Sequence, residues 1–283
     1  MGRGPAGILT FPPFSELAIS GFRWLEYLGI LGFIGVLVVR RLAANPPSLS
    51  WARLPMHYVL AVAFVGGVGA VVARVVLWGN AEAAASYVFG GPDGWARVGR
   101  IGAEGLALAF CLARVRFVVA PGLLAAVLLA FAGHAARVQP QAAGVAADAL
   151  HIFSAGMWAG GIVALATLKP PGGWRNGDGR MLLDRFSRVA PLAFAITALT
   201  GLLRATEELA SVSDLWTSSY GLVLSLKSIG VLAMLVLSWL AWHRGLPVAR
   251  WEAVIALIVM LATAVLIAYP VTPGEASRII STL

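Results

Sequence analysis

The chain has 283 residues, of which 59% are hydrophobic and only 12% are charged, and it carries a formal net charge of +8. So large an apolar fraction excludes an ordinary soluble domain. The basic residues are scattered over short loops rather than gathered in one patch, which argues against a surface for nucleic acid. The sequence has no GxxxxGK[ST] motif for nucleotide phosphates, and Cys111 has no second cysteine with which to form an intrachain disulfide.

Eight stretches of about 20 mostly apolar residues follow one another, each long enough to cross a hydrocarbon core of roughly 30 Å. Backbone groups in lipid must be bonded within their own segment, so long unbroken apolar runs predict helices rather than the alternating strands of a barrel. We therefore predict an all-α membrane helix bundle, a single domain over 1–283 that begins with a short outer segment, 1–21, without a cleavable signal. The predicted spans are 22–42, 56–78, 96–114, 117–136, 147–168, 187–207, 220–243 and 250–270.

The distribution of Lys and Arg predicts the orientation. The loops after the first, third, fifth and seventh spans, with their flanks, hold twelve of the 21 basic residues. By the positive-inside rule these loops face the cytoplasm, so both termini are expected outside a bacterial inner membrane. The longest polar stretch, 169–185, is rich in Gly and Pro and is predicted to be an inner loop.

Glycine spacing supports two further predictions. Arg100 and Lys227 each follow a glycine by six residues, at the starts of spans three and seven. This correspondence favours a four-plus-four repeat with both halves in the same orientation, although glycine is common in any membrane helix. Gly156 and Gly160 are spaced as a small-xxx-small pair, which predicts the close approach of another helix.

Two of the four histidines, His134 and His151, lie close to the outer ends of spans four and five. On a helix of 3.6 residues per turn, Asp148, His151 and Trp158 share one face, while Met157 points elsewhere. Imidazole and carboxylate ligands suit Cu(II), Zn(II) or Ni(II), and thioethers suit Cu(I). These residues predict an outer metal site with His134, His151 and Asp148 as ligands. In the alternative interpretation, the two histidines only form hydrogen bonds to loop carbonyls.

Other polar residues lie inside the predicted spans. Because an unpaired buried charge is costly, we expect Glu104 to pair with Arg100 or Lys227, and we expect the pair to be mainly structural. The alternative is a cation path or proton relay that uses Glu104 together with Glu26. The candidates for such a path, or for its support, are Trp158, Met157, Glu104 and Lys227.

Several blocks in the second half of the chain resemble one known family. GHA at 133–135, DALH at 148–151 and WAGG at 158–161 are followed by RFSR at 185–188, TG at 200–201 and DLWTSSYG at 214–221. In this order they resemble the CopD family of copper-resistance and copper-transport membrane proteins, best over 130–273. The resemblance implies an eight-helix inner-membrane protein that handles copper, more firmly than it implies a direction of transport. We predict copper uptake from the periplasmic side by a protein that is not an enzyme. A copper sensor or assembly factor that binds the ion without transporting it is an alternative. The resemblance also implies a separate CopC-type copper-binding partner in the periplasm, and copper as the metal at the outer site.

The histidine count also fits a different function. Two histidines near each face, with His57 and His243 at the inner ends of spans two and seven, would suffice for two bis-histidine b-type haems in a helix bundle. A Soret band in the optical spectrum would separate a haem protein from a copper protein. In the copper interpretation, His57 and His243 are either an inner exit site or ordinary interfacial residues.

Overall fold

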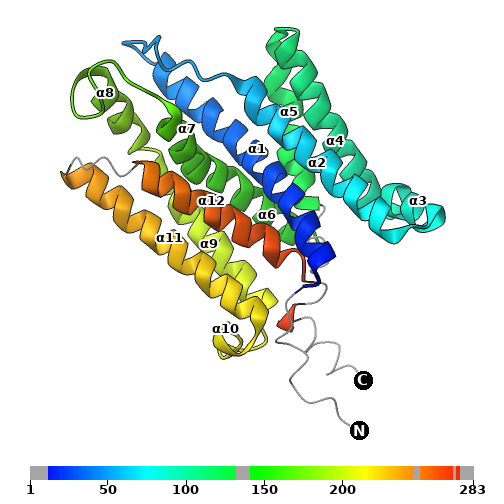
Figure 1. Cartoon of the computed structure of the whole chain (residues 1–283). Coiled ribbons are helices and arrows are strands. Elements are labelled where there is room, and N and C mark those ends of the chain that lie inside the picture. The colour runs from blue at the N-terminus through cyan, green and yellow to red at the C-terminus, as the bar shows by residue number, and fades with distance from the viewer. Residues whose placement is uncertain (1–11, 132–140, 245–248, 270–271, 275–283) are drawn as a thin grey trace.

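The computed structural model describes residues 12–131, 141–244, 249–269 and 272–274. These residues form helices and no strand, which confirms the predicted all-α fold. The long helices run side by side in one bundle (Figure 1). The main elements are α1 (Phe14–Ala44), α2 (Met56–Trp78), α3 (Ala81–Phe89), α4 (Gly91–Leu112), α5 (Val119–Phe131), α6 (Gln141–Ala155), α7 (Gly161–Thr167), α8 (Gly177–Phe186), α9 (Ala190–Glu208), α10 (Asp214–Thr217), α11 (Ser219–Arg244) and α12 (Ala249–Leu266).

Each predicted span overlaps a helical segment of this bundle, and the ends of the fourth and eighth spans lie outside the described residues. The predicted outer segment 1–21 is wrong at its end, because α1 begins at Phe14. The fourth span is α5, preceded by the 3₁₀ turn η2 (Arg116–Val118), and the fifth is α6 continued through the π-helical turn η4 (Gly156–Gly160) into α7. By length and composition, five helical stretches within the described residues are candidates to cross a membrane unaided. They are Phe14–Ala44, Met56–Leu77, Gln141–Thr167, Gly177–Glu208 and Ser219–Leu240.

The predicted inner loop 169–185 is partly wrong, because α8 begins inside it at Gly177. This short helix is amphipathic. Leu182 and Phe186 are buried against the core, whereas Arg180 and Asp184 are exposed and form an ion pair of 3.0 Å. Glycines and prolines precede the helix and dominate the composition of 169–185, so the composition alone predicted a loop and did not indicate the amphipathic pattern of α8.

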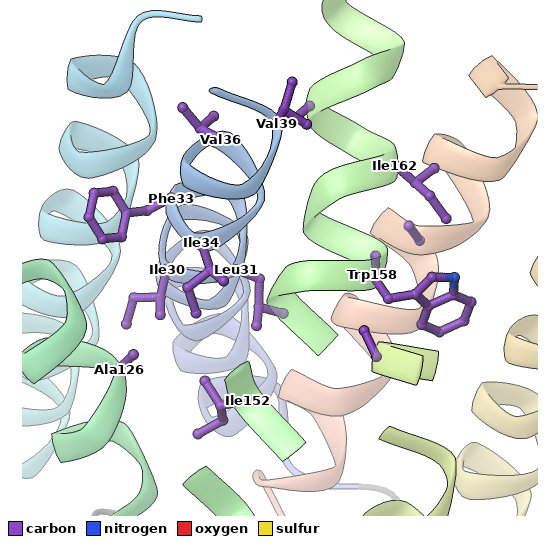
Figure 2. Close-up of a cluster of buried hydrophobic side chains, with 14 of the residues drawn as sticks. Ile30, Leu31, Phe33, Ile34, Val36, Val39, Ala126, Ile152, Trp158 and Ile162 are labelled. Carbon is purple, nitrogen blue, oxygen red and sulfur yellow. The ribbon is translucent and has the colours of Figure 1, made fainter. Parts of the chain in front are cut away.

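Helix α1 lies at the centre of the bundle and packs against α2, α5, η4, α7 and α12. Figure 2 shows its apolar side chains, among them Phe33 and Ile34, in one cluster with Ala126, Ile152 and Trp158 from the surrounding helices. Residues 29–36 of α1 are buried without interruption, as expected of a helical segment that is apolar on all sides. The core of the molecule therefore follows α1.

Glycines bring the backbones of α1 and η4 into contact. A methyl group on Gly35 would collide with the backbone of Gly160, and one on Gly160 would collide with the carbonyl oxygen of Leu31. Gly156 lies against the side chain of Ile34 in the same way. The predicted packing role of Gly156 and Gly160 is therefore confirmed.

The helix pairings of the two halves correspond. Helix α1 and the α6–α7 segment contact each other, α1 packs on α2 and α12, and α6 packs on α9 and α5. The pairs α4–α5 and α11–α12 complete each half. These pairings agree with the predicted four-plus-four repeat. They differ at one place, because α2 packs extensively on α4, whereas α9 and α11 make little contact within the described residues.

Candidate functional site

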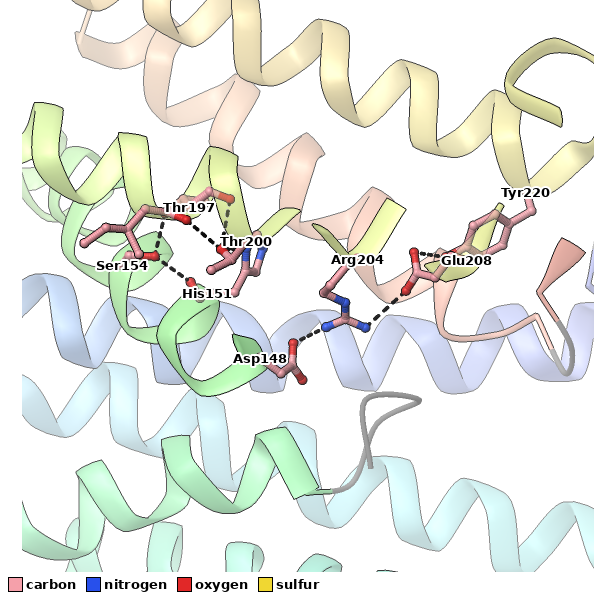
Figure 3. Close-up of polar contacts among 9 residues, drawn as sticks. Asp148, His151, Ser154, Thr197, Thr200, Arg204, Glu208 and Tyr220 are labelled. Carbon is pink, nitrogen blue, oxygen red and sulfur yellow. Dashed lines mark hydrogen bonds and ion pairs between the residues drawn. The ribbon is translucent and has the colours of Figure 1, made fainter. Parts of the chain in front are cut away.

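His151 projects from α6 toward α9 (Figure 3). Helix α6 begins at Gln141, six residues before the predicted span, so His151 lies ten residues into the helix. At a rise of 1.5 Å per residue this is about 15 Å from the start of α6. The imidazole is half-buried and lies deeper in the bundle than the sequence indicated.

A hydroxyl group on α9 fixes the orientation of the His151 ring. The Nδ1 atom of His151 lies 2.9 Å from Oγ1 of Thr200. The Thr200 hydroxyl donates its own hydrogen to the carbonyl of Ile196 at 2.7 Å, so it is left to accept from Nδ1–H. A neutral imidazole that donates through Nδ1 carries its lone pair on Nε2. The Nε2 atom is therefore the one suited to bind a metal ion.

A second pair of hydroxyls joins the same two helices one turn deeper. Thr197 of α9 donates to the Oγ atom of Ser154 at 2.8 Å, and Ser154 donates to the carbonyl of His151 at 3.1 Å. All of these side chains are labelled in Figure 3. The contacts hold α6 against α9 and stiffen the backbone that carries His151.

Asp148 pairs with a cation rather than with the histidine. It forms an ion pair with Arg204 of α9, and Arg204 in turn contacts Oε1 of Glu208 at 3.2 Å. The hydroxyl of Tyr220 donates to Oε2 of Glu208 at 2.6 Å (Figure 3). The predicted role of Asp148 as a ligand or as an orienting group for His151 stays a prediction, and in this structure Thr200 has the orienting position.

Lys227 belongs to the surroundings of this network. It lies on α11 and interacts electrostatically with Arg204, Glu208 and Asp148. Two cations, Arg204 and Lys227, therefore stand near two carboxylates on the side of α6 and α9 that faces α11.

The predicted helical face through Trp158 assumed a regular α-helix, which is wrong between Gly156 and Gly160. The π turn η4 inserts extra backbone there and rotates everything that follows. Trp158 is buried, and its ring meets that of Phe194 edge-on at 4.9 Å. Met157 is half-buried against the same core, so both side chains support the packing of the bundle.

Two of the predicted ligands are not described by the structure. His134 lies in 132–140, outside the described residues, and so does the side chain of His243 in α11. His57 lies in the first turn of α2, with its ring 4.1 Å from that of Tyr58. No group of three or more His, Cys, Asp or Glu side chains is arranged to hold a metal ion in the part of the chain that the structure describes. The inner and outer sites both remain predictions.

Glu104 pairs as the sequence predicted. Arg100 is its ion partner, with Nε 3.9 Å from Oε1 of Glu104. The sequence did not indicate that Glu26 of α1 lies closer still, with its Oε1 atom 2.7 Å from the same nitrogen. Three buried ionisable groups therefore meet in the first half of the chain.

Sequence reasoning missed Thr200 as the residue that orients His151. Hydroxyl residues three apart on one membrane helix, Thr197 and Thr200, form a polar stripe on an otherwise apolar segment. Such a stripe indicates a polar contact with a neighbouring helix. It does not indicate which helix, and for that reason the partner had to come from the structure.

Comparison with known proteins gives two matches. Residues 180–271 match the family model described as "Copper resistance protein D". The chain is also similar to "Copper transport protein CutJ" of Bacillus subtilis (strain 168), with 34% identity over 158 residues, or 52% of this chain and 29% of that protein. The chain thus spans less than a third of its relative, and no solved structure matches it. The predicted resemblance to the CopD family is confirmed. The family match covers Thr200 and Arg204 but neither His134 nor His151.

Proposed function

We propose that this relative of the CopD proteins binds copper on the outer side of a bacterial inner membrane and passes it inward. The observation that carries the proposal is the orientation of His151. Its Nδ1 atom is bonded to Thr200, which directs the lone pair of Nε2 toward a ligand. Outer-shell hydrogen bonds of this kind orient metal-binding histidines.

His134 is the proposed second ligand, because in the sequence it follows the last residue of α5 by three positions and belongs to the GHA block at 133–135 that resembles the CopD family. Two imidazoles favour Cu(II) over Cu(I). Asp148 is the proposed third ligand, and because its Oδ1 atom is paired with Arg204 it would bind through Oδ2. Both termini outside, and delivery of the ion by a CopC-type periplasmic protein, belong to the same proposal. They are supported by the charge distribution and by the family resemblance.

The test is copper binding by the detergent-purified protein. We expect one copper ion per chain, weaker binding in His151→Ala and in His134→Ala, and no binding in the double variant. His57→Ala is the comparison variant. His57 belongs to the predicted inner site, so its replacement should leave copper affinity at the outer site equal to that of the native protein. Unchanged affinity in the double variant would overturn the site.

Two further measurements test the function. Copper uptake into proteoliposomes should require His134 and His151. An optical spectrum of the purified protein should lack a Soret band, whose presence would point to haem instead of copper.

A further inference from the structure

A second polar cluster lies between α1, α2 and α4, three helices that pack side by side (Figure 1). It consists of Glu26, Arg100 and Glu104, and none of the three exposes more than 1% of its surface. Ionisable residues this deep in a membrane bundle are costly, and they usually take part in function. The proposed copper function does not use this cluster.

Arg100 does not supply hydrogen bonds to the two carboxyl groups. Its Nε atom is 2.7 Å from Glu26 and 3.9 Å from Glu104, but neither contact has the direction of a hydrogen bond. Among the described residues, both oxygens of each carboxyl group lack a hydrogen-bond partner, as do Nε and Nη1 of Arg100. Leaving a buried polar atom without a partner destabilises a folded protein, and a charged group more than a neutral one. With both carboxyl groups ionised, the cluster is therefore incomplete.

The two carboxyl groups converge over Gly67 of α2. A methyl group on Gly67 would stand 2.6 Å from Oε2 of Glu104 and 2.9 Å from Oε1 of Glu26, and the two side chains are within hydrogen-bonding reach of each other. Ionised carboxylates only accept hydrogen bonds. A hydrogen bond between them therefore requires that one of them carries a proton.

The charges nearby leave this requirement in place. Arg23, on α1, acts on Glu26 through space, and it keeps its charge while it is hydrogen-bonded to Tyr87 of α3. Arg97, on α4, holds the same tyrosine, with its guanidinium carbon 3.7 Å from the ring centroid. Tyr27, beside Glu26, interacts with both clusters without supplying a cation. Among the described residues, Arg100 is the cation in ion-pair contact with both carboxyl groups, and the hydrogen bond between those groups still requires a proton.

We propose that Glu26 and Glu104 form a buried proton-binding site, in which one exchangeable proton is shared between the two carboxyl groups. The protonated group donates its O–H to the other, and the single remaining negative charge is matched by Arg100. Copper is a poor occupant, because the cluster offers no imidazole or sulfur ligand and Arg100 repels a cation. The proposal does not depend on copper binding at His151.

Infrared difference spectroscopy over a pH titration of the purified protein tests the proposal. The native protein should show the C=O band of a protonated carboxyl group that is lost as the pH rises. Glu26→Gln and Glu104→Gln should each remove this same band, because either change leaves one carboxylate beside one arginine and no need for a proton. The double variant should remove nothing more. Glu252→Gln is the matched control, since Glu252 is a buried carboxyl group on α12 that is bonded to Ser238, and the shared band should persist in it.

Gly67→Ala gives a second test that keeps both carboxyl groups. The added methyl group would stand between them, and the shared band should shift or disappear. Gly102→Ala on α4 is its control, because a methyl group there meets nothing within 4 Å. The proposal is overturned if the bands are unchanged in both glutamine variants, or if each variant removes a different band. Copper binding is measured on the same samples, so that a negative infrared result can be distinguished from a failure of the proposed outer copper site.

Discussion

The two halves of the bundle bury polar groups in different ways. In the second half three polar side chains each have a hydrogen-bond or ion-pair partner: His151 has Thr200, Asp148 has Arg204, and Glu208 has Tyr220. In the first half Glu26 and Glu104 share Arg100, and their oxygens receive no hydrogen bond from the described residues. The satisfied network is suited to holding a side chain in one orientation, whereas the unsatisfied cluster is suited to taking up a proton.

The predicted repeat requires that the two halves have the same orientation in the membrane. Cysteine labelling from one side tests this, because each position either reacts or does not. In a Cys111→Ala background, Glu82→Cys on α3 and Val212→Cys just before α10 should both react with an impermeant maleimide added from outside. Asp178→Cys on α8 should react only after the membrane is opened. All three positions are exposed in the structure. If Glu82→Cys and Val212→Cys react from opposite sides, the parallel repeat and the charge argument are both wrong.

Removing the central cation of each half should have unequal effects. Arg100→Met leaves two fully buried carboxyl groups, and breaking such a buried pair costs about 3–5 kcal/mol. The side chain of Arg204 is 25% exposed, so water partly replaces it and Arg204→Met should lower stability less. Thermal unfolding of the purified proteins, followed by tryptophan fluorescence, measures which of the two substitutions lowers the stability more.

Arg180→Met on α8 is the reference for the stability losses of Arg100→Met and Arg204→Met. Its ion pair with Asp184 is exposed, and pairs of this kind contribute about 0–1 kcal/mol. A loss of stability for Arg204→Met as large as that for Arg100→Met would contradict the distinction between the two halves.

The sequence predicted the helices well and the polar contacts poorly, for one physical reason. Lipid forces backbone hydrogen bonds into each segment, so apolar runs alone locate the helices. Contacts such as Glu26 with Arg100 join helices that are distant in the chain, and only packing decides which helices meet. Asp148, His151 and Trp158 were predicted to share one face of a regular helix, but a 3.6-residue period cannot indicate the π turn after Ala155. His134 remains a prediction, because it lies outside the described residues.

Thr200→Val tests whether Thr200 orients His151 for metal binding. Valine keeps the shape of threonine but leaves Nδ1–H of His151 without its acceptor, at a cost of about 1–3 kcal/mol. Copper affinity at the proposed outer site should fall about 10–100-fold, as for other residues that orient a metal-binding histidine. Both quantities are measured on detergent-purified protein, by thermal unfolding and by competition with a copper chelator.

Thr263→Val on α12 is the control for that substitution. The hydroxyl of Thr263 bonds to the carbonyl of Val259 in its own helix, so its loss should leave copper affinity unchanged. Equal affinities for Thr200→Val and the native protein would mean that Thr200 does not orient a ligand.

The smallest expected effects concern two helical glycines, one in each half. Replacing glycine by alanine inside a helix gains up to about 1 kcal/mol where space allows. Gly102 in α4 has open space, so Gly102→Ala should raise the unfolding midpoint. A methyl group on Gly201 in α9 would stand 3.4 Å from Cε1 of His151, which is van der Waals contact without a clash. Gly201→Ala should therefore stabilise the protein no more than Gly102→Ala does, and it should leave the His151–Thr200 hydrogen bond in place. A large loss of copper affinity in Gly201→Ala, with its folding intact, would show that the imidazole has to move toward α9 when it binds the ion.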